Sequence, residues 1–253
     1  MLNRKCIILV LVGVLFSEMS KAEWKRPTKI GKEWLKSHDT NVKYSIKDIP
    51  PNDYKMAAEL MAKSYMTGEP LYSMFHVASD PNSVKFLEKQ LLAILKQKIS
   101  IAAYELGTNK MIGLNLLYVV QQNDAPTDAT KHIKSGNLKK TQEVLGLVEP
   151  TDVFGILGAN KYLKCSGMWV DSDYFGNKIG DNLILSRKDM FTEYQLTVTT
   201  GIYSTTFSNQ FADALNFYTH KSIPYDSIIG TYTELQGING TVLTFKSNNF
   251  QNA

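Results

Sequence analysis

Residues 170–188 read VDSDYFGNKIGDNLILSRK, a polar loop with two glycines between a short apolar strand and a predicted helix. Such a loop commonly binds phosphate groups, because free backbone N–H groups converge at a helix N-terminus. Phe175 and Lys178 stand where a tight phosphate-binding loop favours a small or cationic residue and a glycine. Taken alone, the spacing of Gly176 and Gly180 favours an ordinary strand–loop–helix connection. Whether the loop binds an anion therefore has to be judged from the rest of the chain.

The hydrophobic pattern on both sides of this loop predicts alternating strands and helices. Expected strands cover residues 42–49, 99–105, 111–120, 162–170, 196–207, 227–235 and 241–246, and the last two are expected to form a hairpin around the turn at 237–240. Expected helices cover residues 53–65, with Asn52 as a cap, then 81–95, a region ending at 147, the segment after the glycine loop to 194, and 209–221. This order predicts an α/β (α+β) fold in which one mixed sheet is covered by helices on both faces.

The N-terminus has the pattern of a secretory signal peptide over residues 1–22. Arg4 and Lys5 precede the apolar run CIILVLVGVLF, and the small residues Ser20 and Ala22 stand at the positions that matter for cleavage. The apolar run has 11 residues, whereas a membrane-spanning helix needs about 20. The alternative is an uncleaved N-terminal anchor. Cleavage would place the protein outside the cell or in the lumen of the secretory pathway, with no membrane association expected afterwards.

The charge and length of the cleaved chain limit which kinds of partner and how many domains it can have. Removing three basic residues and one acidic residue lowers Lys plus Arg from 28 to 25 and Asp plus Glu from 24 to 23, so the net charge falls from +4 to +2. No run of basic residues suggests nucleic acid, and no nucleic-acid partner is expected. The remaining residues suit one domain over 42–253, preceded by an arm over 23–41 that packs on it. A monomer is expected.

The cysteines and histidines suggest no metal and no disulfide. Cys6 leaves with the signal peptide, so Cys165, in a predicted buried strand, has no partner and is expected to be a packed core thiol. The alternative, a nucleophile, lacks a histidine placed by any recognised motif. Metal-ligand spacing is absent from the histidines, which are His38, His76, His132 and His220. The sequence Asn239-Gly240-Thr241 is a glycosylation sequon in a predicted turn.

Several phrases together resemble a known family. EWKRP at 23–27, YSIKDIP at 44–50, TGEPL at 67–71 and the glycine loop are similar to segments of the Gcn5-related N-acetyltransferase superfamily, most closely its insect arylalkylamine N-acetyltransferase-like branch. The resemblance covers residues 24–246. It implies a single mixed, mostly antiparallel twisted sheet of about six to seven strands, flanked by helices on both faces.

The resemblance implies acetyl-CoA as the co-substrate. In the family, the strand before the loop lines the pantetheine and acetyl groups, and here that strand ends in Met168, Trp169 and Val170. The loop then offers backbone N–H groups to the pyrophosphate, at the helix N-terminus. The corresponding residues here are Phe175, Gly176, Asn177, Lys178, Ile179, Gly180 and Asp181. Phe175 replaces an Arg or Gln of the family pattern, Lys178 replaces a Gly, and Trp169 is bulky for this strand.

The resemblance also implies the catalytic groups. Glu69, in an intact Glu-Pro-Leu phrase, would be the general base for the incoming amine, and the alternative is an exposed carboxylate in a turn. Ser208 and Tyr218 are the candidates that would return a proton to the leaving thiolate, although each also fits a cap or core position. The implied activity is direct acetyl transfer to a small primary amine of the arylalkylamine kind. The alternative is a secreted, catalytically degenerate protein of this fold that acts as a binding protein.

Overall fold

A computed structural model describes residues 24–38, 40–122, 136–238 and 240–250. The predicted signal peptide, His132 and the sequon residue Asn239 lie outside these ranges. Within them, the helices are all too short or too polar to cross a membrane.

One mixed sheet of eight strands forms the centre of the molecule, which confirms the expected architecture with slightly more strands than predicted. Its spatial order is β1-β2-β3-β4-β5-β6-β8-β7. Only β5 and β6 pair in parallel, and all other neighbours are antiparallel. The strands are β1 (Glu33–Ser37), β2 (Tyr44–Asp48), β3 (Ile101–Glu105), β4 (Met111–Gln121), β5 (Lys161–Val170), β6 (Thr199–Tyr203), β7 (Tyr218–Pro224) and β8 (Val242–Asn248).

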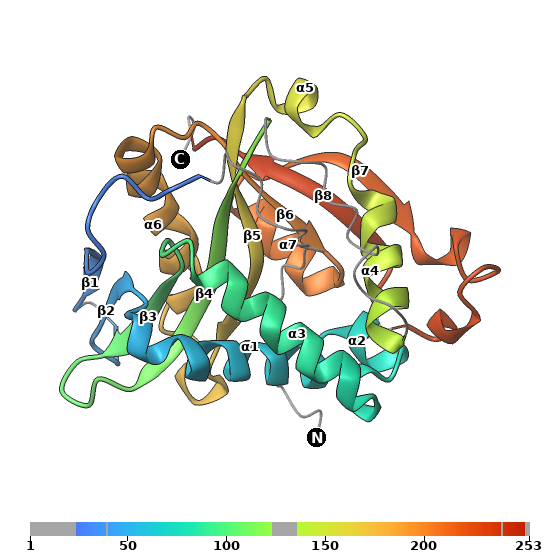
Figure 1. Ribbon diagram of the computed structural model, residues 1–253, viewed down its shortest axis with the longest axis horizontal. Coiled ribbons are helices and arrows are strands. Elements are labelled where there is room, and N and C mark those ends of the chain that lie inside the picture. Colours follow the sequence, from blue (N-terminus) through green and yellow to red (C-terminus); the bar gives the residue numbers. More distant parts are fainter. Residues whose placement is uncertain (1–23, 39, 123–135, 239, 251–253) are drawn as a thin grey trace.

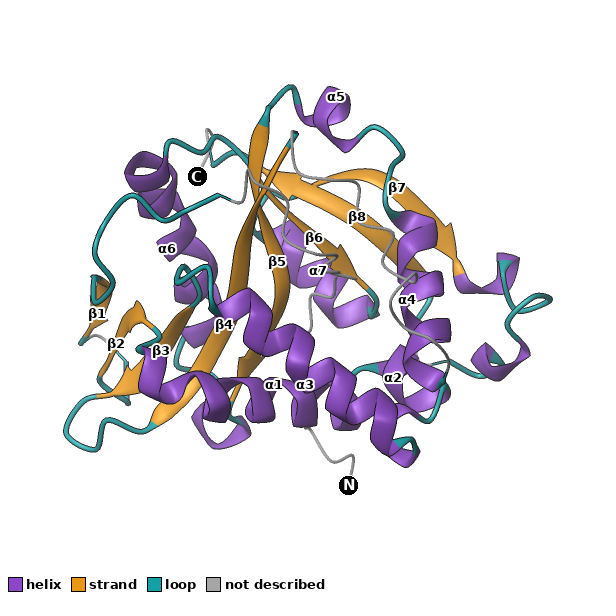
Figure 2. Ribbon diagram, viewed as in Figure 1, coloured by secondary structure: helices purple, strands orange, loops and turns teal. Residues whose placement is uncertain are grey.

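Helices cover both faces of this sheet (Figures 1 and 2). One face carries the first four helices, α1 to α4, and the other carries α6, α7 and the N-terminal arm. The helices are α1 (Tyr54–Gly68), α2 (Pro70–Met74), α3 (Pro81–Leu95), α4 (Asn137–Val148), α5 (Val153–Leu157), α6 (Ile179–Tyr194) and α7 (Thr206–Ala214).

Helix α3 shows how the sequence specifies these elements. Pro81 occupies the first turn, where its missing N–H is not needed, and Asp80 caps the helix by accepting from the backbone N–H of Asn82 at 3.1 Å. Leu87 and Leu91 lie one turn apart and are both 2% exposed. Burial of each such leucine contributes roughly 1.5–3 kcal/mol to folding.

The structure adds one element near the N-terminus and corrects one prediction. The arm contributes an edge strand, β1, which pairs with β2. Asn52 does not cap the first helix, because Pro51–Asp53 form a 3-10 turn and Asp53 takes the cap position. α3 has its predicted bounds and α4 ends one residue beyond the predicted end at 147, whereas the short helices α2 and α5 have no counterpart among the predicted helices.

The predicted C-terminal hairpin is wrong. The helix expected over 209–221 ends at Ala214, because Asn216 adopts a left-handed backbone with φ +60°, and the residues from Tyr218 form β7. β7 rather than 227–235 pairs with β8. The segment 227–235 folds into turns whose apolar side chains pack against the core on the α1–α4 face. Its alternating pattern reflects that packing, not a strand.

Candidate active site

A bulge in β5 sets the geometry of the candidate site. Leu116 of β4 pairs with Gly167, but the next residue, Leu117, pairs with Cys165, so Ser166 is an extra residue in β5. A bulge bends its strand and increases the local twist. On the other side, β5 pairs with β6 only through Leu163 and Lys164. The two parallel strands therefore part at the bulge.

Side chains from both faces of the sheet hold the carbonyl groups of the bulge. The hydroxyl of Tyr65, on α1, donates to the carbonyl oxygen of Ser166. The Nδ2 of Asn115, on β4, donates to the carbonyl oxygen of Gly167 at 2.8 Å. Buried carbonyl groups need such partners, because an unpaired one costs about 1–3 kcal/mol. The bulge is thus a fixed feature of the fold.

Asn115 is itself held by a buried arginine on α6. Arg187 is 0% exposed, and its Nε donates to Asn115 Oδ1 at 3.0 Å. Its Nη1 donates to Thr199 Oγ1 at 3.2 Å, while its Nη2 has no hydrogen-bond partner. Within the described residues, Arg187 forms no ion pair with a carboxylate. A buried guanidinium with only neutral partners is costly, which makes this residue unusual.

Glu69 lies at the junction of α1 and α2. It closes α1, and its side chain caps α2 by accepting from the backbone N–H of Tyr72 at 3.0 Å. Pro70 follows as the first residue of α2, a position that tolerates the missing N–H. The carboxyl group is 0% exposed. The alternative reading of Glu69 as an exposed turn carboxylate is therefore wrong.

Burial changes the acidity of this carboxyl. Desolvation raises the pKa of Glu69 from 4.5 to about 7, and the nearby Ser204 hydroxyl and the backbone N–H of Tyr72 offset part of the rise. Within the described residues, neither Glu69 Oε1 nor Ser204 Oγ makes a hydrogen bond of ordinary geometry. One carboxylate oxygen therefore lacks a partner. A carboxyl with a pKa near 7 can accept a proton at neutral pH.

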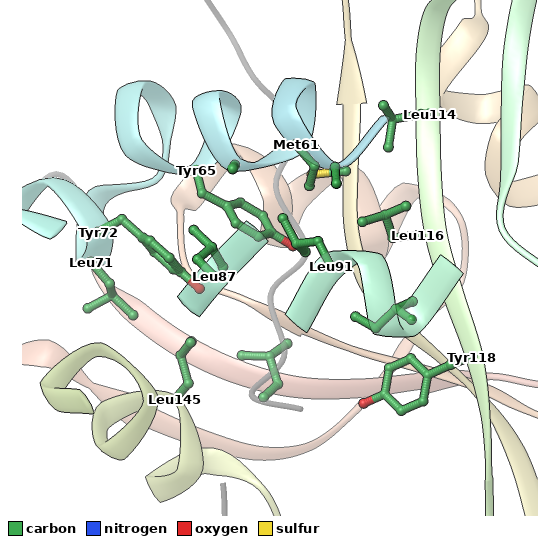
Figure 3. Close-up of a cluster of buried hydrophobic side chains, with 14 of the residues drawn as sticks. Met61, Tyr65, Leu71, Tyr72, Leu87, Leu91, Leu114, Leu116, Tyr118 and Leu145 are labelled. Atoms are coloured by element: carbon green, nitrogen blue, oxygen red, sulfur yellow. The ribbon is translucent and has the colours of Figure 1, made fainter. Parts of the chain in front are cut away.

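Tyrosines surround Glu69. Tyr65 and Tyr72 lie on either side of it along the chain, with ring centroids 5.0 Å apart, and Figure 3 shows both rings within the buried cluster. The hydroxyl of Tyr225 donates to the backbone carbonyl of Ser204 at 2.9 Å. Gln142 of α4 donates to Tyr72 Oη at 3.2 Å. The carboxyl is therefore fully buried among aromatic rings.

The glycine loop leaves a row of backbone donors free. Gly176 has φ +83° and Lys178 has φ +56°, both in the left-handed region. Within the described residues, the backbone N–H groups of residues 176–181 donate no hydrogen bond. Asn182 is the first to do so, to the carbonyl of Lys178 at 3.0 Å. Consecutive free N–H groups at a helix N-terminus form a cradle for an anion.

Side chains around this loop both support and oppose anion binding. Asn177 fixes the loop to β2, since its Oδ1 accepts from the N–H of Val42 at 3.2 Å and its backbone carbonyl accepts from Tyr44 Oη at 3.0 Å. Phe175 packs against the core of the α6 face and supplies no charge. Asp181 places a negative charge in the first turn of α6, beside the exposed Lys178.

The end of β5 borders a groove. Met168 and Val170 are buried on the α6 face, whereas Trp169 is half-buried and packs toward the α1 face. Trp169 lines a groove of about 190 Å³ with residues of α1, among them Lys63 and Ser64. This groove connects the loop end of β5 with the α1 surface. The bulky side chain of Trp169 therefore forms part of the wall of this groove.

The predicted proton donors stand apart from Glu69. Ser208 is buried, and its Oγ forms a capping box with Thr205 at the start of α7. Tyr218 is 69% exposed on β7, where its ring packs on His220. Among the described residues, neither contacts Glu69 or the bulge in β5 through a hydrogen bond or a ring contact. Their proposed roles stay predictions.

Some site residues had no role assigned from the sequence. Asn115 stands as a single polar residue inside the apolar run MIGLNLLYVV, and Arg187 is a single cation on the buried side of α6. A polar residue in an otherwise apolar run was the available signal for Asn115, whereas Arg187 stands among the polar residues Ser186, Lys188 and Asp189 and gave no such signal. Ser204 and Tyr225 come together with Glu69 only through the three-dimensional fold. Cys165 is buried, and no group of His, Cys, Asp and Glu within the described residues could hold a metal ion.

Known structures share this fold. No protein-family model and no curated protein sequence matches the chain. Arylalkylamine N-acetyltransferase 7 from the yellow fever mosquito Aedes aegypti superposes with a TM-score of 0.80 at 18% identity, over 89% of this chain and 99% of that one. The polyamine N-acetyltransferase of Drosophila melanogaster, which forms N-acetylagmatine, gives 0.65 at 13% identity, over 82% and 100%. The chain therefore has the fold of these N-acetyltransferases.

Proposed function

We propose that the protein is an acetyl-CoA-dependent N-acetyltransferase that acetylates a small primary amine of the arylalkylamine kind, with Glu69 as the general base. The observation that carries the proposal is the environment of Glu69. Its carboxyl is fully buried, fixed as the cap of α2, and has a pKa of about 7. The fold shared with known N-acetyltransferases supports the same reaction class.

The expected chemistry is direct transfer. Near pH 7 an alkylamine is mostly protonated and has no lone pair with which to attack. Glu69 accepts that proton, and the free amine attacks the thioester carbonyl carbon. A C–N bond forms, the C–S bond breaks, and the sulfur leaves as a thiolate that takes up a proton. The products are the amide and free CoA thiol.

The residues of β5 and the glycine loop fit acetyl-CoA. The free N–H groups of residues 176–181 suit a pyrophosphate, because they converge at the N-terminus of α6. β5 pairs with β6 only through Leu163 and Lys164 among the described residues, so the backbone of β5 beyond them, toward Met168, is where an extended pantetheine chain would lie. When bound, acetyl-CoA supplies the activated acetyl group as a thioester. The contribution of the chain is to orient that thioester toward Glu69 and to exclude water.

The test is an assay of free CoA thiol with a panel of arylalkylamines and polyamines. We expect turnover that rises with pH through about 7, the pKa of Glu69. Glu69→Gln should lower kcat by at least about 100-fold, as expected for loss of a general base, and leave acetyl-CoA binding nearly unchanged. Asp189→Asn, at an exposed position of α6, removes the same charge as a control and should keep full activity. Unaltered turnover of Glu69→Gln would remove Glu69 from the mechanism.

A second function is favoured by the loop itself. Lys178 occupies a left-handed conformation, Phe175 supplies no charge, and Asp181 faces the same helix terminus. Each feature weakens an anion site, and together they suit a protein that keeps the fold but acts by binding a partner. Calorimetric titration with acetyl-CoA separates the two functions. Micromolar affinity supports the enzyme, and no binding up to millimolar concentration supports the binding protein.

A further inference from the structure

A basic groove lies between the N-terminal arm and the turn that joins α3 to β3. It has a volume of about 670 Å³, and its charged lining residues are all cationic. Lys25 and Lys29 come from the arm, and Lys96 and Lys98 come from the turn. All of these lysines are exposed. The groove involves neither the glycine loop nor Glu69, so the proposed acetyl transfer does not account for it.

The lysines of the groove are available for a ligand. Within the described residues, none of the four forms an ion pair or a side-chain hydrogen bond. The fifth cation, Arg26, is used internally, because its Nη2 lies 2.8 Å from Asp48 Oδ2. Four uncompensated positive charges around one concavity attract anions.

Arg26 fixes the two walls of the groove in place. Its Nη1 donates to the backbone carbonyl of Lys98, and its Nε donates to the carbonyl of Thr28 in the arm at 3.1 Å. The side chain is nearly fully buried, and its guanidinium lies over the ring of Tyr194, 5.3 Å from the centroid. The relative position of the two walls is therefore fixed in the unliganded protein, which lowers the entropic cost of binding a ligand.

The backbone conformation of Lys98, on one wall of the groove, is unusual for a lysine. Its φ is +63°, a left-handed conformation that favours glycine and strains a lysine. A glycine there would relieve the strain, yet the chain carries a cation pointing to solvent. A residue that is unfavourable for the backbone but completes a charged surface is what selection for binding would produce.

We propose that this groove binds a sulfated polysaccharide chain. Two lysines on each wall can contact a linear polyanion from both sides, whereas a flat membrane would meet only the rim. The one aromatic residue lining the groove, Trp24, is 9% exposed. Nucleic-acid bases therefore find no exposed ring on which to stack. Lysine ammonium groups act as point charges that suit scattered sulfate groups.

The test measures binding of a heparin decasaccharide to the full chain by calorimetry at two salt concentrations. Lys96→Gln combined with Lys98→Gly should weaken binding roughly tenfold and reduce the salt dependence by about two counterions. Because glycine suits the backbone at position 98, this variant should melt no lower than the unaltered chain. The matched control is Lys85→Gln with Lys89→Gln, an equal loss of charge on exposed α3 positions outside the groove.

Each outcome decides the proposal. Selective weakening by the groove variant supports it. Equal weakening by the control variant, or no heparin binding by the unaltered chain, overturns it. Tighter binding to a single-stranded oligonucleotide or to vesicles containing phosphatidylserine would assign the groove to another ligand class and also overturn it. Acetyl-transfer activity is not measured, so the result is independent of the proposed function.

Discussion

The Nδ2 of Asn115 lies 2.8 Å from the carbonyl oxygen of Gly167 and gives that carbonyl a side-chain partner at the bulge in β5. Asn115 in turn accepts from Arg187, which reaches it from α6. One polar chain therefore runs from the helix after the glycine loop, through β4, to the point where β5 and β6 part. These contacts fix α6 and the bulge in β5 relative to each other.

Asn115→Leu and Arg187→Met should differ sharply in their effect on stability. Asn115→Leu leaves the Gly167 carbonyl and the Nε of the buried Arg187 guanidinium without partners, which should cost roughly 3–5 kcal/mol of unfolding free energy. Arg187→Met removes the buried charge and leaves only neutral acceptors, so its cost should stay below about 1.5 kcal/mol. Urea unfolding measures both. An equally large loss for Arg187→Met would mean that the guanidinium has a stabilising counter-charge.

Glu69 should make the folded protein less stable as pH rises. Its pKa is raised from 4.5 to about 7, so the folded state holds this proton more tightly than the unfolded state does. Stability from this group is therefore present below about pH 4.5 and is lost between pH 4.5 and 7. The loss should amount to roughly 3 kcal/mol. Glu69→Gln removes the titrating group and should flatten the difference between unfolding free energies at pH 5 and pH 8.

The control for that measurement is a carboxyl whose pKa moves the other way. Asp80 is a cap whose pKa is lowered by its hydrogen bonds, chiefly with the Ser83 hydroxyl. Asp80→Asn should therefore leave the loss of stability between pH 5 and 8 unchanged. If Glu69→Gln behaved like Asp80→Asn, the raised pKa of Glu69 would be refuted.

The glycine loop can be tested by changing it toward the pattern of the acetyltransferase family that its sequence resembles. Phe175→Arg with Lys178→Gly keeps the net charge, relieves a left-handed lysine and adds a guanidinium near the free N–H groups of residues 176–181. We expect acetyl-CoA to bind about tenfold more tightly, since charge-assisted bonds to phosphate are strong. Calorimetric titration measures the change.

The control substitution for the loop variant lies at the other end of α6. Gln195 has φ +53° and is exposed just beyond the C-terminus of α6. Gln195→Gly should relieve similar backbone strain, raising stability by up to about 1 kcal/mol, without changing acetyl-CoA affinity. No tightening by the loop variant would indicate that the loop does not meet the pyrophosphate.

The sequence was sufficient to predict the helices and loops that have strong local signals. α3 begins at Pro81, as its opening residues and hydrophobic period predict, and the glycine loop leads directly into α6, as the strand–loop–helix pattern predicts. β1 was missed because an exposed edge strand carries no continuous apolar pattern. The segment 227–235 was assigned to a strand because turns that pack on a core can imitate alternation.

The site was predictable only in part, for a physical reason. Glu69 was found from a short phrase, but its pKa is raised by desolvation, and the fold that buries it brings Ser204 and Tyr225 close from distant parts of the chain. Desolvation is produced by the complete fold and leaves no local mark in the sequence. The same holds for the bulge at Ser166, since register shifts follow from pairing with β4 and not from β5 alone.

The contact between α1 and the bulge provides the last prediction. A Cβ at Gly167 would lie 2.2 Å from Tyr65 Oη and 2.9 Å from Tyr65 Cζ, so Gly167→Ala must displace this ring. The displacement breaks the bond from Tyr65 to the Ser166 carbonyl, and we expect a loss of about 2–3 kcal/mol in unfolding free energy. In a Tyr65→Phe background that bond is already gone and the clash is smaller, so Gly167→Ala should cost at least about 1 kcal/mol less. Urea unfolding of the two single variants and the double variant measures this coupling. Strict additivity would show that α1 does not pack against the bulge as described.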